Sequence, residues 1–123
     1  MAIKINLEST VIPVEIGDLK FEIDVTDEKY ERYIQAFNTF LDDVSALDET
    51  AAEDLALLKA KQTQVYDVLL GAGAFESVYQ LAPSVVITTG ILTQVVEQLE
   101  KEMMKRLEGK AIKGVPKKKI AKN

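Results

Sequence analysis

The stretch GAGAFESVYQLAP at residues 71–83 contains the Gly-x-Gly spacing with which several folds hold a nucleotide phosphate. The dinucleotide-binding fingerprint needs a further glycine where this chain has Glu76, whose negative charge would repel a phosphate. The lysine and hydroxyl residue of a Walker loop are missing, and the preceding residues have helical periodicity rather than that of a strand. We therefore expect Gly71 to end one helix in a left-handed conformation and Gly73 to act as a hinge into the next.

Neighbouring carboxylates are the second candidate for chemistry, as metal ligands or as a general acid and base. The four pairs are Asp27-Glu28, Asp42-Asp43, Asp48-Glu49 and Glu53-Asp54. Adjacent residues on a helix point about 100° apart, so the two carboxylates of a pair do not converge on one ion. After Asp42 the ligand positions of a calcium loop carry apolar residues, and the central glycine is absent. We expect these residues to form solvated faces and helix caps.

The composition removes most catalytic chemistry. The chain has no histidine and no cysteine, which excludes Ser-His and Cys-His nucleophile pairs and nearly every zinc, haem and iron–sulfur site. A glycosidase-type pair of carboxylates assembled across the fold stays open, although no motif points to one. We expect a protein that is not an enzyme, with no catalytic residues, no metal, no cofactor and no small-molecule substrate.

Four tyrosines and four phenylalanines are spread through the chain, mostly at helical spacing. Aromatic side chains in this pattern normally face the core. The functional alternative is an exposed groove that binds a partner segment. The best candidates for such a surface are Tyr30, Tyr33, Phe75 and Tyr79, with Gly71 and Gly73 as the hinge beside the second pair.

Charge is distributed unevenly over the 123 residues, whose net charge is −5. Residues 1–108 contain all 20 acidic side chains and nine Lys/Arg, whereas residues 109–123 contain six lysines and no acid. We expect residues 1–108 to form a single globular domain that repels nucleic acid, and residues 109–123 to be a basic, disordered tail. The tail either contacts an acidic partner or nucleic acid, or simply remains solvated.

The N-terminus alternates and carries charges, so it lacks the apolar region of a signal peptide. No run approaches the roughly 18–20 apolar residues of a membrane span. We expect a cytoplasmic protein that does not bind membranes.

Apolar and polar residues alternate from residue 3 to residue 25, with Gly17-Asp18 in the middle as a two-residue turn. Such a turn pairs Ile16 with Leu19 and sets Glu15 opposite Lys20. Pro13 cannot donate a ladder hydrogen bond, so its strand is an edge or is bonded on one side only.

Helical periodicity follows the hairpin. We expect a helix that begins after an N-cap at Thr26, and a second that begins with a Thr50–Glu53 capping box and ends at Gly71. A short helix should span about 74–81, and a last helix about 83–108, with Pro83 in its first turn. The stripe of the last helix is Val86, Leu92, Val96, Leu99, Met103 and Leu107. The fold class is α+β: a small antiparallel N-terminal β-sheet, a hairpin, packed with a bundle of three to four helices.

The stretch QVYDVLLGAGAFESVYQ at residues 64–80 resembles the tail assembly chaperones of long-tailed phages and Gram-positive prophages. The short IKIN opening, the hairpin at Gly17-Asp18 and the acidic helix after Thr26 fit the same family. The resemblance implies a non-enzymatic protein that shields the tape-measure protein until the tail-tube protein polymerises around it. It also implies that the tape-measure protein is the partner, with the tail-tube protein as a second candidate.

Two other functions stay open. One is a phage tail structural or completion component that forms a homo-oligomer, because apolar helix stripes pack equally well within a chain or between chains. The other is a small regulatory protein whose basic tail contacts nucleic acid, which the acidic body makes the less favoured of the two.

Overall fold

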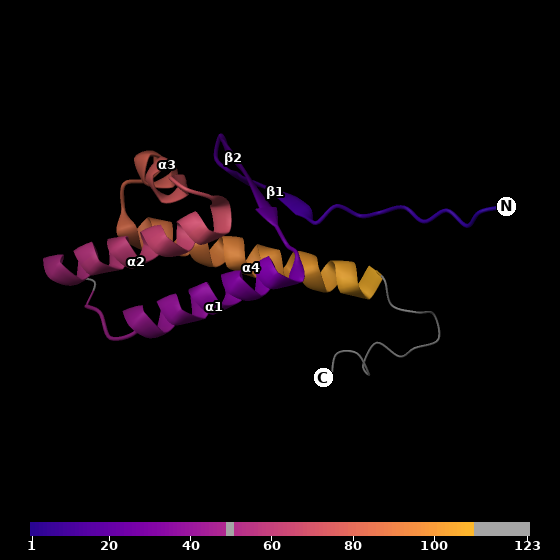
Figure 1. Ribbon diagram of the computed structural model, residues 1–123. Coiled ribbons are helices and arrows are strands. Elements are labelled where there is room, and N and C mark those ends of the chain that lie inside the picture. Colours follow the sequence, from indigo (N-terminus) through magenta and orange to yellow (C-terminus); the bar gives the residue numbers. More distant parts are fainter. Residues whose placement is uncertain (49–50, 110–123) are drawn as a thin grey trace. The chain divides into compact units, whose positions relative to one another are not determined.

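A computed structural model describes residues 1–48 and 51–109 and shows an N-terminal hairpin followed by four helices (Figure 1). The elements are β1 (Val11–Ile16), β2 (Leu19–Asp24), α1 (Asp27–Val44), α2 (Ala52–Leu70), α3 (Ala74–Leu81) and α4 (Val85–Gly109). The expected α+β class is confirmed. The chain divides into two units, residues 1–90 and residues from 91 onward. A single domain over 1–108 therefore stays a prediction.

The hairpin has the predicted turn and register. Gly17 has a φ of 57°, a left-handed conformation that glycine adopts without steric cost. Ile16 pairs with Leu19, and Glu15 stands opposite Lys20. The two strands form a two-stranded antiparallel sheet, with Pro13 in β1. Ile23 is fully buried on the apolar face of the sheet, which therefore contributes to the core of residues 1–90.

Residues 1–9 have the same alternation as the hairpin but form no strand. They extend away from β1 without regular structure (Figure 1). Their apolar side chains are in solvent, with Ile3, Ile5 and Leu7 at 90%, 81% and 96% exposure. The alternation over residues 3–8 therefore does not indicate a strand within this chain.

α1 packs beside α2, and α2 also contacts α3 and β2. Thr26 is the N-cap residue of α1 as predicted, although its side chain makes no capping hydrogen bond. The apolar stripes of the two helices supply buried side chains, including Tyr33, Phe40, Leu58, Val65 and Leu69. This stripe-to-stripe burial is what an amphipathic helix pair requires.

The start of α2 differs from the predicted capping box. Ala51 is the N-cap residue, so the helix begins one residue later than a cap at Thr50 would place it. Thr50 itself lies outside the described residues. The carboxylate of Asp54 instead accepts a hydrogen bond from the backbone N–H of Asp48 at 2.7 Å, which fixes the chain before the helix.

α4 begins at Val85, two residues after Pro83, so the prediction that Pro83 lies in its first turn is wrong. Ser84 caps the helix instead: its Oγ accepts a hydrogen bond from the N–H of Ile87 at 3.3 Å. Serine satisfies a free N–H at this position, which proline cannot do through a side chain.

The β-branched stretch VVITTG is helical, as predicted. Of the predicted stripe, Leu92, Val96 and Leu99 are buried, whereas Val86 and Leu107 are about half exposed. No helix in the described ranges combines the length and hydropathy that crossing a bilayer demands. The predicted disordered tail, apart from Gly109 at the end of α4, lies outside the described residues.

Candidate interaction groove

A surface groove of about 420 Å³ lies where α2, α3 and the first turn of α4 meet. Its lining is mostly apolar, with one lysine at its edge: Leu55, Ala56, Lys59, Tyr79, Pro83, Ser84, Val85 and Val86. Val86 is 53% exposed, and the next residue, Ile87, is 54% exposed. An exposed valine in a mostly apolar hollow makes this the best candidate in the described ranges for binding an apolar segment.

Tyr79 lines the groove, and the rings of Tyr66 and Phe75 form a row behind it. The rings of Tyr66 and Phe75 are 5.3 Å apart in an edge-to-face arrangement, and those of Phe75 and Tyr79 are 5.5 Å apart and stacked. The ammonium of Lys59 lies 4.0 Å from the ring centroid of Tyr79. Tyr66 and Phe75 are buried, so they hold the half-buried Tyr79 in place from behind.

The predicted hinge glycines position this row. Gly73 is in the left-handed conformation (φ 82°, ψ 0°), whereas Gly71 combines a positive φ of 104° with an extended ψ of 162°. The left-handed residue is thus Gly73 rather than Gly71, since the chain must first leave α2 in an extended conformation and then turn into α3.

Asp67 completes the turn between α2 and α3. Its backbone carbonyl accepts a hydrogen bond from the N–H of Gly71 at 3.1 Å, and its Oδ1 accepts one from the N–H of Phe75 at 3.3 Å. A carboxylate at the start of a helix satisfies a free N–H and suits the helix dipole. Asp67 therefore has a structural role that the sequence analysis did not assign.

A buried polar network behind the groove was also missed. Gln62 and Thr88 are fully buried. The Gln62 amide donates to the Val85 carbonyl at 3.0 Å and to the Thr89 hydroxyl, and its oxygen accepts from the Thr88 hydroxyl at 2.7 Å. The Tyr66 hydroxyl donates to the Thr88 carbonyl at 2.6 Å.

This network joins α2 to the first turns of α4, so two sides of the groove are held at a fixed separation. A signal was present in the sequence: Gln62 occupies a stripe position four residues after Leu58 and four before Tyr66. A polar residue on an apolar stripe indicates a buried partner.

The other two predicted residues, Tyr30 and Tyr33, do not line the groove. Tyr33 is buried, and its hydroxyl donates to the Asp24 carbonyl at 2.8 Å, where α1 meets the hairpin. Burial raises the pKa of the Tyr33 hydroxyl. Tyr30 is half-buried on the same helix. Partner binding at all four aromatics stays a prediction, and the structure buries Tyr33 and Phe75 in the core.

Asp24 is the charged group at this junction. The Thr10 hydroxyl, followed by Lys29 at 3.3 Å, lowers the pKa of its carboxyl against the opposing effect of desolvation. Its Oδ1 is enclosed and accepts no hydrogen bond of standard geometry from the described residues. We therefore attribute the effect of Thr10 to proximity rather than to a well-formed bond.

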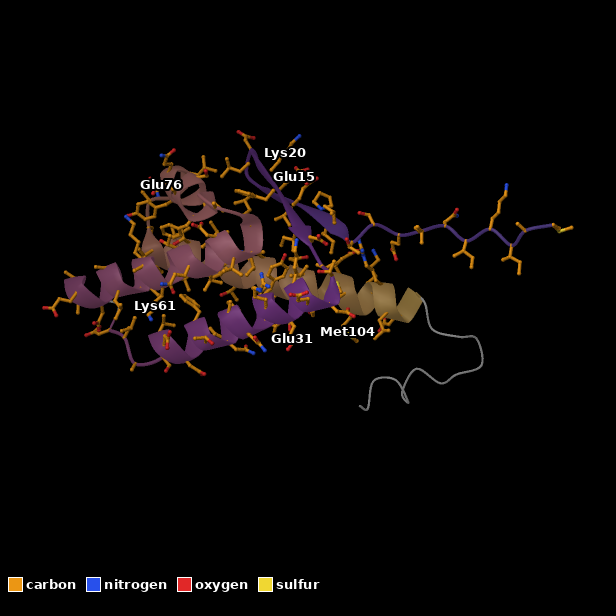
Figure 2. The ribbon with its side chains drawn as sticks, in the orientation of Figure 1. Glu15, Lys20, Glu31, Lys61, Glu76 and Met104 are labelled. Atoms are coloured by element: carbon orange, nitrogen blue, oxygen red, sulfur yellow. The ribbon has the colours of Figure 1, made fainter. Side chains whose placement is uncertain are left out.

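A second hollow, of about 330 Å³, lies between α1 and α2. It is crossed by an ion pair between Lys61 Nζ and Asp43 Oδ2 at 3.3 Å, and Figure 2 shows Lys61 between the two helices. Arg32 also contributes to its lining. Because three charged side chains line it, this hollow is less suited to an apolar segment than the groove is. Within the described ranges, no three potential metal-ligating side chains come together.

Comparison with protein-family models, with curated proteins and with solved structures finds no match.

Proposed function

We propose that the protein is a non-enzymatic tail assembly chaperone of a long-tailed phage, whose groove shields an apolar segment of the tape-measure protein. The observation that carries the proposal is the groove itself, a mostly apolar hollow lined by Tyr79 and by the exposed Val86. The resemblance of residues 64–80 to such chaperones adds support, because these residues include Tyr79 and the buried rings of Tyr66 and Phe75 behind it.

The groove suits one face of an amphipathic helix. Its apolar lining would receive the apolar side chains, in the manner of other helix-in-groove complexes. Lys59 at the edge would face the polar flank of that helix and favour a carboxylate there. A long helical protein with exposed apolar stripes aggregates on its own, so masking these stripes would keep it available for assembly.

Charge fits a shielding role. Residues 1–108 are strongly acidic, so complexes coated with several copies would repel one another and resist aggregation. Binding by burial and shape alone is reversible, which would let tube subunits displace the chaperone later. The proposed partners are therefore the tape-measure protein and then the tube protein, in the bacterial cytoplasm.

The test is co-expression of the source phage's tape-measure protein with the wild-type chain or with Val86→Asp. An aspartate in the first turn of α4 suits the helix dipole, so this variant should fold normally. We expect the soluble fraction of the tape-measure protein to fall by about tenfold with the variant, as expected for a buried charge in an apolar contact.

The matched control is Val68→Asp, which changes an exposed valine of α2 in the second hollow. This variant should protect the tape-measure protein as the wild type does. Loss of protection by Val68→Asp but not by Val86→Asp would move the site to the second hollow. Absence of protection by the wild type would reject the chaperone.

One observation favours the second candidate, a tail component that forms a homo-oligomer: the apolar side chains of residues 3–7 have no cover within the chain. The third candidate, a regulatory protein with a nucleic-acid-contacting tail, rests on residues 109–123, nearly all outside the described ranges, and stays a prediction.

A further inference from the structure

We propose that residues 4–8 bind as an added antiparallel strand to the outer edge of β2 in a second copy of this chain. The observation behind this proposal is that an exposed, alternating segment and an open sheet edge occur in one chain. The proposal concerns association of the protein with itself and does not depend on the proposed chaperone function.

The hydrogen-bond pattern of the hairpin identifies which backbone groups face outward. The N–H of Val25 donates to the carbonyl of Thr10 at 2.7 Å, and these residues continue the register that pairs Ile16 with Leu19. In an antiparallel ladder, hydrogen-bonded pairs alternate with pairs whose N–H and C=O groups point away from each other. Residues 11, 13 and 15 of β1 and residues 20, 22 and 24 of β2 therefore direct their backbone groups to the outer edges.

The outer edge of β1 is closed to an added strand. The N–H of Val11 already donates to the Oγ of Ser9 at 3.0 Å. Pro13 has no N–H to offer, which leaves Glu15 as the one remaining donor of this edge among the described residues. Proline on an edge strand is a common way to prevent further pairing.

The outer edge of β2 presents backbone donors and acceptors to an added strand, which the outer edge of β1 does not. Lys20 and Glu22 have exposed side chains, and none of their outward groups takes part in a hydrogen bond described for residues 1–48 and 51–109. Asp24 bounds this edge, because its carbonyl accepts from the Tyr33 hydroxyl. The edge is thus open over about five residues, the length of segment 4–8.

Charges match in one antiparallel register. When Asn6 lies opposite Glu22, each charged residue of segment 4–8 meets the opposite charge on β2. The pairs are Lys4 with Asp24, Asn6 with Glu22, and Glu8 with Lys20. Opposite charges that face each other across a strand pair stabilise the pairing. Moving the segment two residues toward the turn would set Glu8 opposite Asp18 and lose this match.

The same register also matches the apolar faces. Ile5 then flanks Ile23, and Leu7 flanks Phe21, on the face that points to the core. Because side chains alternate along a strand, a shift by one residue would send these apolar groups to the solvent side. Pairing would thus cover side chains that are over 80% exposed in the single chain.

The segment cannot reach this edge in its own chain. Antiparallel to β2, residue 8 would lie on the far side of the hairpin from Val11. Residue 8 and Val11 would then be separated by about 10 Å across two strand spacings and by about 13 Å along the strands. Three residues span at most about 11 Å. A second copy must therefore supply the strand.

Engineered cysteines test the register directly, because the chain has no cysteine of its own. Asn6→Cys and Glu22→Cys are made in separate full-length chains, mixed and oxidised, and the mixed dimer is quantified by mass spectrometry. A hydrogen-bonded pair has its Cα atoms about 5.5 Å apart, within the range of a disulfide. The control mixture combines Asn6→Cys with Glu15→Cys. Glu15 is exposed on the closed edge of β1, near the hairpin tip, where Figure 2 also shows Lys20 of β2.

We expect at least about tenfold more mixed dimer with Glu22→Cys than with Glu15→Cys. Equal yields from the two mixtures, or no mixed dimer in either, would overturn the proposal. A wild-type chain that sediments as a monomer at high micromolar concentration would overturn it as well.

Two further variants separate backbone pairing from side-chain contact. Glu22→Pro removes the outward N–H from the middle of the open edge and mirrors Pro13 across the hairpin. The paired change Ile5→Asp with Leu7→Asp alters only exposed side chains, so it leaves the single chain folded. Each should raise the dissociation constant of the self-association by about tenfold or more. If neither changes it, another surface joins the copies.

Discussion

Residues 3–8 and residues 11–16 carry the same alternation of apolar and polar side chains, yet only the second stretch is a strand. The difference lies in what each can pair with. β1 is followed by a two-residue turn that brings β2 beside it, whereas residues 3–8 have no edge within reach. Alternation therefore indicates a capacity to form a strand, and a partner edge decides whether the strand forms.

The largest expected effect comes from truncating one isoleucine in the paired hairpin and one in the unpaired residues 3–8, and comparing the loss of stability. Ile23 is fully buried on β2, so Ile23→Ala should lower the free energy of unfolding by about 2–5 kcal/mol. Ile5 is exposed, so Ile5→Ala should change it by less than about 0.5 kcal/mol in a dilute sample. Urea unfolding followed by circular dichroism measures both. Similar costs would show that residues 3–8 are packed in the single chain.

The turn at Gly17-Asp18 gives residues 11–16 a partner strand that residues 3–8 lack. Gly17 has a positive φ, so Gly17→Ala should destabilise the hairpin by about 1–2 kcal/mol. Gly90 in α4 has no positive φ and open space around its Cα, so Gly90→Ala should stabilise by up to about 1 kcal/mol. Thermal unfolding of both variants checks the signs. Stabilisation by Gly17→Ala would mean that the turn is not left-handed.

Hydrogen exchange would sharpen the comparison at the level of single amides. In dilute protein, the amides of residues 3–7 should exchange at close to the free-peptide rate, while those of Ile12 and Val14 are protected by the ladder. At high concentration, the proposed pairing should slow exchange in residues 4–8 and at Lys20 and Glu22 together. Protection of one group without the other would point to a different contact.

The smallest expected effect concerns Asp24, at the junction between the hairpin and α1. Its pKa is lowered below 3.8 in the folded chain, so its contribution to stability is complete above that pH and is lost as the pH falls through the folded value. Asp24→Asn should slightly reduce the free energy of unfolding at neutral pH. It should also weaken the fall of that free energy as the pH drops below 3.8. Urea unfolding at a series of pH values measures this dependence. If the variant loses stability in acid as the wild type does, Thr10 and Lys29 do not favour the charged carboxylate of Asp24.

Local chemistry made several features predictable. The turn at Gly17-Asp18, the register from Ile16 and the span of α3 follow from residues that lie next to one another in the chain. The choice of helix for VVITTG was also correct, because the 3.6-residue period outweighed β-branching.

Features that depend on distant partners were not predictable in the same way. The Gln62–Thr88 contact joins residues 26 positions apart, and only the fold shows that the hydroxyls of VVITTG face α2. For the same reason, the sequence did not show that the predicted aromatic residues lie in two separate places. Phe75 and Tyr79 form one row with Tyr66, whereas Tyr33 is occupied with the hairpin.

The aromatic row has an optical consequence. The chain contains no tryptophan, so its ultraviolet emission comes from four tyrosines alone. Tyr79 sits at the groove with a lysine ammonium over its ring. A tryptophan placed there would be the sole fluorophore of its kind in the molecule. Its emission colour would then report, without any label, whether the groove is filled by water or by a partner.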